Sequence, residues 1–346
     1  MAEFFATLTV PPPDVSSRTA EAIALERWGI SARAKALRGE RDRNFHLSAA
    51  DGREYVLKFA NPVEDAAVRD MQIAALCHMA RLDFGLTVPR VIPLPDGALE
   101  TPVSDATGGV LYVRLLTWVA GQPVFSSRRS ATQRFAYGQA LARLQIALQD
   151  FSHPASDHAL FWDIQHALRL REIAFTIPHA GARAMLDQLL DEFEARVTPV
   201  MPVLRRQVLH NDVNWHNTFV DPADHDRITG VIDFGDMVET TLIFDIAAAA
   251  TSQPAADMGA AEALLHFIGG FHAVRPLLPM EIELLPLSIG VRIAVGLSLA
   301  SWHRHVHPDN PHFDLTEEAI LRRTAAIAEM RSPEVEQAVR RACGIG

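Results

Sequence analysis

The sequence has few cysteines, few lysines and no long uninterrupted apolar run. Only Cys77 and Cys343 occur in 346 residues, far apart and without metal-type spacing. This argues against a disulfide framework and indicates a reducing, cytoplasmic compartment. No apolar run reaches the roughly eighteen residues of a membrane span. The first thirteen residues lack the basic start of a signal peptide. We therefore expect no membrane partner.

Positive charge is also scarce. The formal net charge of −10 does not provide the basic face of a nucleic-acid-binding protein, so we expect no nucleic-acid partner. The same acidic charge leaves the oligomeric state open. At 346 residues the chain is long enough for two packed lobes.

Lysine is so rare that each one needs an explanation. Lys35 and Lys58 are the only two, and Lys58 lies within the apolar run YVLKFA. A buried lysine is costly unless it is paired, so Lys58 is either an outward-facing edge residue or a contact for nucleotide phosphates, held by an acid of the following helix. Asp70 is the preferred partner, because Glu64 and Asp65 fall in the first helical turn, where acids are common.

The richest pattern runs from Val208 to Gly235, VLHNDVNWHNTFVDPADHDRITGVIDFG. It places Asp212, Asn217 and Asp233 at the ends of short apolar runs. Kinase-like phosphoryl transfer requires this order, with a base, a metal-binding Asn and a metal-binding Asp before Phe-Gly. Each fragment alone is weak, since a lone Asp at a strand end is more often a turn residue. The ordered combination predicts a phosphotransferase site.

The first part of the chain reads as a sheet with two helices. A helix capped at Ser16 ends at Gly29, and a second runs from Pro62 to Ala80. The predicted strands are Ala32–Leu37, Asn44–Leu47, Glu54–Phe59, Arg90–Leu94 and Val110–Leu116. Asp51-Gly52 between two of them predicts a hairpin.

The rest is mostly helical and begins near Gly121-Gln122-Pro123. The predicted helices are Ala131–Leu148, Phe161–Phe175, Ala182–Val197, Leu242–Ala250, Met258–Phe271, Glu281–His303 and Thr316–Met330. We therefore predict an α+β, two-lobed plan, with an antiparallel-sheet lobe in residues 1–118 and a helical lobe in residues 119–346. Such plans place ligands in the cleft between lobes.

Two further segments are candidates for nucleotide contacts. The turn from Gly39 to Asn44 could cover phosphates with backbone amides, although a plain hairpin turn explains it nearly as well. Beyond the last strand of the first lobe, the backbone around Leu116 and Trp118 would meet the base in a kinase-like site.

These segments resemble the aminoglycoside phosphotransferase–choline kinase superfamily. LHNDVNWHNTFV, GVIDFGDM and YVLKFA are similar to its three signatures, in its order. GERDRNF, VRLLTWVAG and DFGDM are similar to stretches of the hydroxylysine kinase-like branch. The resemblance implies a protein-kinase-like fold and transfer of a γ-phosphoryl group from ATP or GTP, with Mg²⁺, to a small-molecule hydroxyl.

Carried over by position, the resemblance also implies residue roles. Lys58 would bind phosphates, Asp212 would be the base, His210 would brace its loop, Asn217 and Asp233 would bind magnesium, and Asp245 would support the loop from the next helix. Two departures are Asp70, where the family usually has Glu, and Trp215, where related sequences often carry a smaller or polar residue.

The acceptor is less well defined. Asp163, Asp236 and Glu239 are candidates for a substrate ammonium, although Asp163 is first of all a plain helix N-terminal acid. Arg292 could pair with a substrate carboxylate or with a neighbouring acid. The histidines from His303 to His312 could bind a metal, but a polar loop is the simpler interpretation.

We therefore expect a kinase for a small hydroxylated amine or amino acid, similar to hydroxylysine. The alternatives are an inactive nucleotide-binding module and an aminoglycoside, homoserine or choline-type phosphotransferase. A metal hydrolase built on His210, Asp212 and His216 lacks the dense ligand set of a two-metal site.

Overall fold

The structure, a computed structural model of the whole chain, describes residues 10–39, 41–105, 108–307 and 315–346. The first nine residues and His312 of the predicted histidine cluster lie outside this part. Two compact units divide the chain. The first unit contains the described residues through Asp83, with Thr87–Ala120 and His153–Ser156; the second contains Phe84–Leu86, Gly121–Ser152 and the described residues from Asp157.

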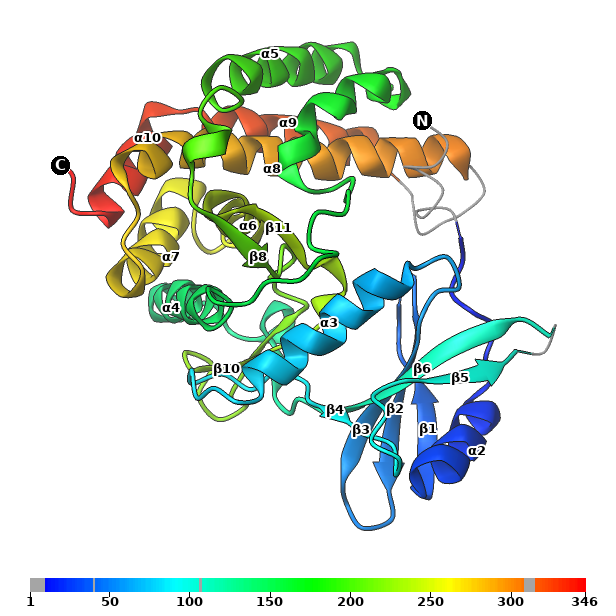
Figure 1. Cartoon of the computed structure of the whole chain (residues 1–346). Coiled ribbons are helices and arrows are strands. Elements are labelled where there is room, and N and C mark those ends of the chain that lie inside the picture. The colour runs from blue at the N-terminus through cyan, green and yellow to red at the C-terminus, as the bar shows by residue number, and fades with distance from the viewer. Residues whose placement is uncertain (1–9, 40, 106–107, 308–314) are drawn as a thin grey trace. The chain divides into compact units, whose positions relative to one another are not determined.

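An antiparallel sheet forms the centre of the first unit (Figure 1). Its strands are β1 (Ala32–Ala36), β2 (Arg43–Ala49), β3 (Glu54–Phe59), β4 (Val91–Ile92), β5 (Thr101–Ser104) and β6 (Val110–Thr117). The order is β1-β2-β3-β6-β4, and β5 also pairs with β6. The predicted Asp51-Gly52 hairpin is confirmed, since β2 pairs with β3 and Gly52 has a φ of +83°. Strand β5 was not predicted from the sequence.

Helix α2 (Ser17–Trp28) has the ends that the sequence predicts. The Ser16 hydroxyl accepts a hydrogen bond from the Thr19 N–H at 3.1 Å, and Gly29 ends the helix in the left-handed conformation that glycine adopts without strain. Helix α2 contacts β1 and contributes to a core that includes Phe45, Leu57 and Leu115 of the sheet.

Helix α3 (Ala66–Met79) begins four residues later than predicted. Asp65 is its N-cap and accepts from the Ala67 N–H at 2.7 Å. The capping carboxylate satisfies a free N–H group, so the helix starts there and not at Pro62.

The second unit contains short strands surrounded by helices (Figure 1). The strands β7 (Gln122–Pro123), β9 (Thr218–Val220) and β10 (Ile228–Val231) form one sheet, and β8 (Arg206–Leu209) pairs with β11 (Val238–Thr241). The helices are α4 (Ala131–Ala147), α5 (Ala180–Arg196), α6 (Leu242–Ala250), α7 (Ala260–Val274), α8 (Pro279–Val306), α9 (Glu317–Met330) and α10 (Pro333–Ala342). The expected α+β plan is confirmed, although β7, β11 and α10 were not predicted.

Two glycines let α4 and α7 pack backbone against backbone. A side-chain carbon on Gly138 would overlap the Phe267 carbonyl, and one on Gly270 would overlap the Phe135 carbonyl. Only glycine permits this approach.

One segment differs from its predicted form. The predicted helix Phe161–Phe175 consists instead of two 3₁₀ segments, η2 (Ile164–Glu172) and η3 (Ala174–Thr176).

Helix α8 is long and apolar enough to span a membrane by length and composition, but 72% of its most apolar stretch is buried inside the protein. A buried core helix passes the same test, so this is weak evidence for a span.

Candidate active site

The loop between β8 and β9 is fixed at its start by His210. This buried ring accepts from the Asp212 N–H at Nδ1 over 3.3 Å, and its Nε2 lies 3.0 Å from the Ile232 carbonyl. An acceptor at Nδ1 requires the proton on Nε2, which then donates to Ile232. The ring also packs edge-on against Phe234, with centroids 4.6 Å apart. His210 thus joins the loop to the end of β10, as a bracing residue must.

Helix α6 fixes the next residue. Asn211 has a φ of +63°, a left-handed conformation that asparagine tolerates better than most residues. Its backbone N–H donates to Asp245 Oδ1 at 2.8 Å, and Gln145 Nε2 donates to Asp245 Oδ2 at 2.8 Å. Burial raises the pKa of Asp245, despite these hydrogen bonds. Asp245 therefore has the contacts of the supporting residue that the family resemblance implied.

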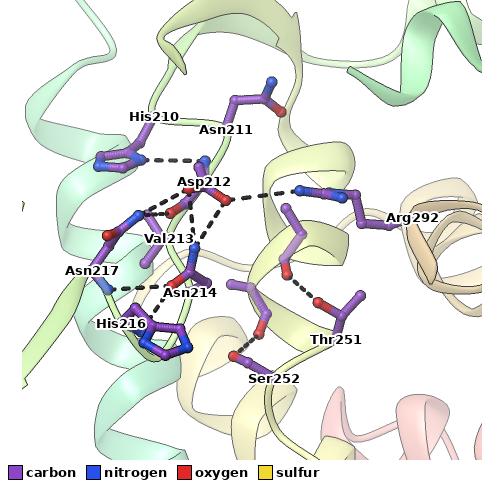
Figure 2. Close-up of polar contacts among 12 residues, drawn as sticks. His210, Asn211, Asp212, Val213, Asn214, His216, Asn217, Thr251, Ser252 and Arg292 are labelled. Carbon is purple, nitrogen blue, oxygen red and sulfur yellow. Dashed lines mark hydrogen bonds and ion pairs between the residues drawn. The ribbon is translucent and has the colours of Figure 1, made fainter. Parts of the chain in front are cut away.

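Asp212 is oriented by two asparagines, as Figure 2 shows. The Asn214 amide lies 3.0 Å from both carboxylate oxygens, and the Asn217 amide donates to Oδ2 at 2.9 Å. The Asn217 amide also lies 3.0 Å from the Asp212 carbonyl. Because the asparagine amides fix its orientation, the carboxylate can serve as a positioned group.

The electrostatic surroundings make Asp212 a suitable proton acceptor. Burial raises its pKa to about 7, with further raising by the charges of Asp236 and Asp233, while Arg292 and the Asn214 hydrogen bond oppose the rise. A general base works best when its pKa lies near the working pH, and strongly shifted carboxylates often mark functional sites.

Asp233 and Asn217 present oxygens that accept no hydrogen bond from the described part of the chain. Asp233 is exposed, has a φ of +67° and makes no capping hydrogen bond at η5 (Phe234–Asp236). Within the described chain, no residue donates to Asp233 or to Asn217 Oδ1. Carboxylate and amide oxygens are ligands for hard cations such as Mg²⁺, so these residues fit the predicted metal.

No group of three or more His, Cys, Asp or Glu side chains in the described ranges could hold a metal ion. A magnesium bound by one carboxylate and one amide completes its shell with phosphate and water oxygens, so this finding is compatible with that pair. The same finding gives no support to the hypothesis of a metal hydrolase built on His210, Asp212 and His216. His216 packs against Phe125 with ring centroids 4.6 Å apart. In the histidine cluster, the His305 ring contacts Phe175.

The structure separates the three acidic acceptor candidates. Asp236 is half-buried in η5 and raises the pKa of Asp212, while Glu239 is half-buried on β11 with its carboxylate 3.9 Å from Arg206 Nε. Asp163 is fully buried and caps η2. It accepts from the Gln165 N–H and from the Thr240 hydroxyl at 3.0 Å. The helix-cap interpretation of Asp163 is therefore confirmed, and contact with a substrate ammonium does not fit this burial.

Arg292 on α8 lies beside Asp212. One of its terminal nitrogens is 3.8 Å from Asp212 Oδ1 (Figure 2). The neighbouring acid that sequence analysis left open is thus Asp212.

In the first unit, the predicted partner of Lys58 is wrong. Lys58 forms a buried ion pair with Asp42, whose carboxylate also accepts from the Asn61 N–H at 2.9 Å. Asp70 is 74% exposed on α3 and contacts His153 Nε2 at 3.1 Å. Burial alone would raise the pKa of Asp42, but Lys58, the Asn61 N–H and the charge of Arg114 together lower it.

A pattern in the sequence could have identified Asp42. Asn44 lies directly opposite Lys58 in the β2–β3 register, and alternate residues of an extended chain point to the same face. Two residues earlier than Asn44, the chain therefore brings Asp42 toward Lys58. Arg114 lies opposite Lys58 on β6 and donates to Gln72 of α3 at 2.6 Å. Asn214, Arg114 and Gln72 were also missed.

The two predicted base-contact residues are built into the first unit. Leu116 is buried on β6 opposite Val56. The Trp118 ring lies 4.2 Å from the His46 ring, and its backbone N–H donates to the Glu54 carbonyl at 3.3 Å. That N–H is therefore already used within the unit.

Comparisons with known proteins show which family this chain belongs to. Residues 33–277 match the profile of a family described as "Phosphotransferase enzyme family". Hydroxylysine kinase of Mus musculus is 24% identical over 79% of this chain and 78% of its own length, and that of Danio rerio is 24% identical over 94% and 95%. A microcompartment-associated aminopropanol kinase superposes with a TM-score of 0.70 at 19% identity, covering 96% of this chain and 99% of its own. The resemblance inferred from the motifs is confirmed.

Proposed function

Because the chain belongs to the phosphotransferase enzyme family, we propose that it is a small-molecule kinase that phosphorylates a hydroxyl group of a small amine or amino acid. The observation that carries this proposal is the Asp212 carboxylate, which two asparagine amides orient and whose pKa is raised to about 7 by burial and the neighbouring acids. A carboxylate with this pKa is suited to act as the general base that accepts the proton of an alcohol.

In this mechanism Asp212 positions the acceptor hydroxyl and takes its proton. The acceptor oxygen forms a bond to the γ-phosphorus, while the bond from that phosphorus to the bridging oxygen breaks. The products are a phosphate monoester and a nucleoside diphosphate. Because the transition state is loose, positioning by Asp212 matters as much as its basicity.

The nucleotide is ATP or GTP, and the metal is Mg²⁺. Asn217 and Asp233 supply its protein oxygens, and a bound cation of this kind neutralises charge on the phosphates. Lys58 contacts the phosphates, and Asp42 is its counter-ion. His210 and Asp245 keep the loop that carries Asp212 in place.

The acceptor is a hydroxylated amine or amino acid similar to hydroxylysine. This choice of acceptor is supported by the relatives named hydroxylysine kinase, which align over 79% and 94% of this chain. Asp236 and Glu239 are the acids assigned to the substrate ammonium, because both belong to the unit that contains Asp212.

A transfer screen tests the proposal. Purified protein is mixed with Mg²⁺ and either ATP or GTP, and with hydroxylated amino acids and amino alcohols, and phosphorylated products are detected by mass spectrometry. We expect acceptor-dependent product from the natural sequence and little from Asp212→Asn.

The competing hypothesis is a nucleotide-binding module without activity. It predicts nucleotide-induced thermal stabilisation with no acceptor-dependent product. The intact set of Asp212, Asn217 and Asp233 favours the active enzyme, since degenerate modules usually lose one of these residues.

A further inference from the structure

Arg292 is a largely buried cation with almost none of its hydrogen-bonding capacity used. Its side chain is 18% exposed, and its closest charged partner is Asp212 at 3.8 Å. Within the described part of the chain, its Nε is buried without a partner and its guanidinium makes no hydrogen bond. Buried guanidinium groups normally satisfy several of their five donors. An anion is the natural completion of this group.

Arg292 and Asp212 do not form a hydrogen bond with each other. At 3.8 Å the contact is too long for a hydrogen bond. The Asp212 oxygens already accept from Asn214 and Asn217. Arg292 thus lies next to the base without orienting it.

Helix α8 carries a glycine one turn beyond Arg292. This residue, Gly296, lies on the same face of the helix. A side-chain carbon placed on Gly296 would meet no atom within 4 Å beyond the backbone of its own helix. The described part of the chain therefore does not pack against α8 at this position.

We propose that Arg292 binds the carboxylate of the acceptor, which makes the acceptor a hydroxylated amino acid in preference to an amino alcohol without a carboxylate. The planar fork of arginine matches a carboxylate through two parallel hydrogen bonds. This inference rests on the proposed kinase function and specifies its substrate class.

Charge around Asp212 supports the assignment. The charges of Asp236 and Asp233 both act on Asp212, so the surroundings of Asp212 are acidic and repel a carboxylate. Arg292 is a cation that acts on Asp212, and its charge can compensate a carboxylate bound there. The acceptor ammonium is attracted by the same acids.

The test compares two acceptors that differ only in the carboxylate. These are 5-hydroxylysine and its decarboxylated analogue, assayed with the natural sequence, Arg292→Met and Arg292→Lys. We expect Arg292→Met to lower kcat/KM about 100-fold more for the amino acid than for the amino alcohol, mainly through KM, because the loss of positive charge beside Asp212 acts on both acceptors alike. Arg292→Lys should recover part of the loss. Arg322→Met, at an exposed position of α9, is the control and should match the natural sequence.

A binding measurement avoids dependence on turnover. Lysine and cadaverine lack the hydroxyl and differ in the carboxylate, so both serve as competitive inhibitors. Arg292→Met should weaken inhibition by lysine and should not weaken inhibition by cadaverine, which has no carboxylate.

Two results would overturn the assignment. Equal losses with both acceptors would mean that Arg292 acts on the base or on the transferred phosphoryl group. A natural enzyme that prefers the amino alcohol would exclude a carboxylate site. Absence of turnover with every acceptor, together with no inhibitor binding, would instead reject the proposed function itself.

Discussion

The partners of Asp212 and Lys58 lie at very different distances along the chain. Asp212 is held by Asn214 and Asn217, which follow within five residues in one loop. Lys58 pairs with Asp42 from before the β2–β3 hairpin, although Asp70 on α3 is nearer in sequence. Sequence spacing was informative in the first region and misleading in the second.

The difference has a simple physical origin. A short loop allows few conformations, so side chains two and five residues apart can meet only in a few ways. The partner of a strand lysine depends on which face of a neighbouring strand or helix turns toward it. That choice is made by packing of the whole sheet, and spacing alone does not determine it.

The strongest test of the first region is Asp212→Asn. We expect turnover to fall by roughly two to four decades, the range for a positioned acid–base group, with nucleotide affinity nearly unchanged. The amide keeps the shape but lacks the basic oxygen. Steady-state turnover and calorimetric titration with ATP and GTP measure the two effects. Turnover equal to the natural enzyme would move the base to another acid, with Asp236 as the first candidate.

The second region is tested by substituting each of the two acids, Asp42 and Asp70, by asparagine. Asp42→Asn removes the charge opposite buried Lys58, so we expect a loss of about 3 kcal/mol in unfolding free energy and a higher KM for the nucleotide. Asp70→Asn is the matched control and should change stability by less than about 0.5 kcal/mol, because Asp70 is 74% exposed. Chemical denaturation measures both. The opposite ranking would restore Asp70 as the partner of Lys58.

Prediction from sequence followed the same division, except that Asn214, two residues from Asp212, was also missed. The α+β plan, the hairpin at Asp51-Gly52 and both ends of α2 were predicted correctly, because each depends on short-range turn or cap chemistry. Asp42 and the Gln72–Arg114 hydrogen bond were missed because they join separate elements. The 3₁₀ form of η2 was missed because its apolar residues also fit an α-helix.

Asp163 was a candidate for the acceptor site, but the structure shows it as a buried helix cap. The pH dependence of stability tests this structural role. Burial raises its pKa from 3.8 to about 6, against hydrogen bonds from Gln165 and Thr240. The folded protein therefore binds this proton more tightly than the unfolded chain. Its contribution to stability is fully present below pH 3.8 and is lost as pH rises to about 6.

The loss amounts to at most roughly 3 kcal/mol, at about 1.4 kcal/mol per pKa unit. Asp163→Asn cannot titrate, so the difference in unfolding free energy between the natural protein and this variant should change across that pH range and be constant above it. A constant difference from pH 4 to 7 would show that burial does not raise the pKa of Asp163.

The smallest expected effect concerns the backbone of the Asp212 loop. Asn211 has a φ of +63°, where a residue with a side-chain carbon is strained by about 1–2 kcal/mol and glycine is not. Asn211→Ala and Asn211→Gly both remove the amide, so their difference in stability contains this strain and the conformational freedom of glycine, but no side-chain contact of Asn211. We expect the alanine variant to be less stable by about 1 kcal/mol, since the greater unfolded-state freedom of glycine offsets part of the strain.

Asn214, whose φ is not positive, is the control, and there the alanine variant should be the more stable one. Thermal unfolding of the four variants measures both orders. The same order at both positions would mean that side-chain contacts, and not local backbone conformation, fix the loop that carries Asp212.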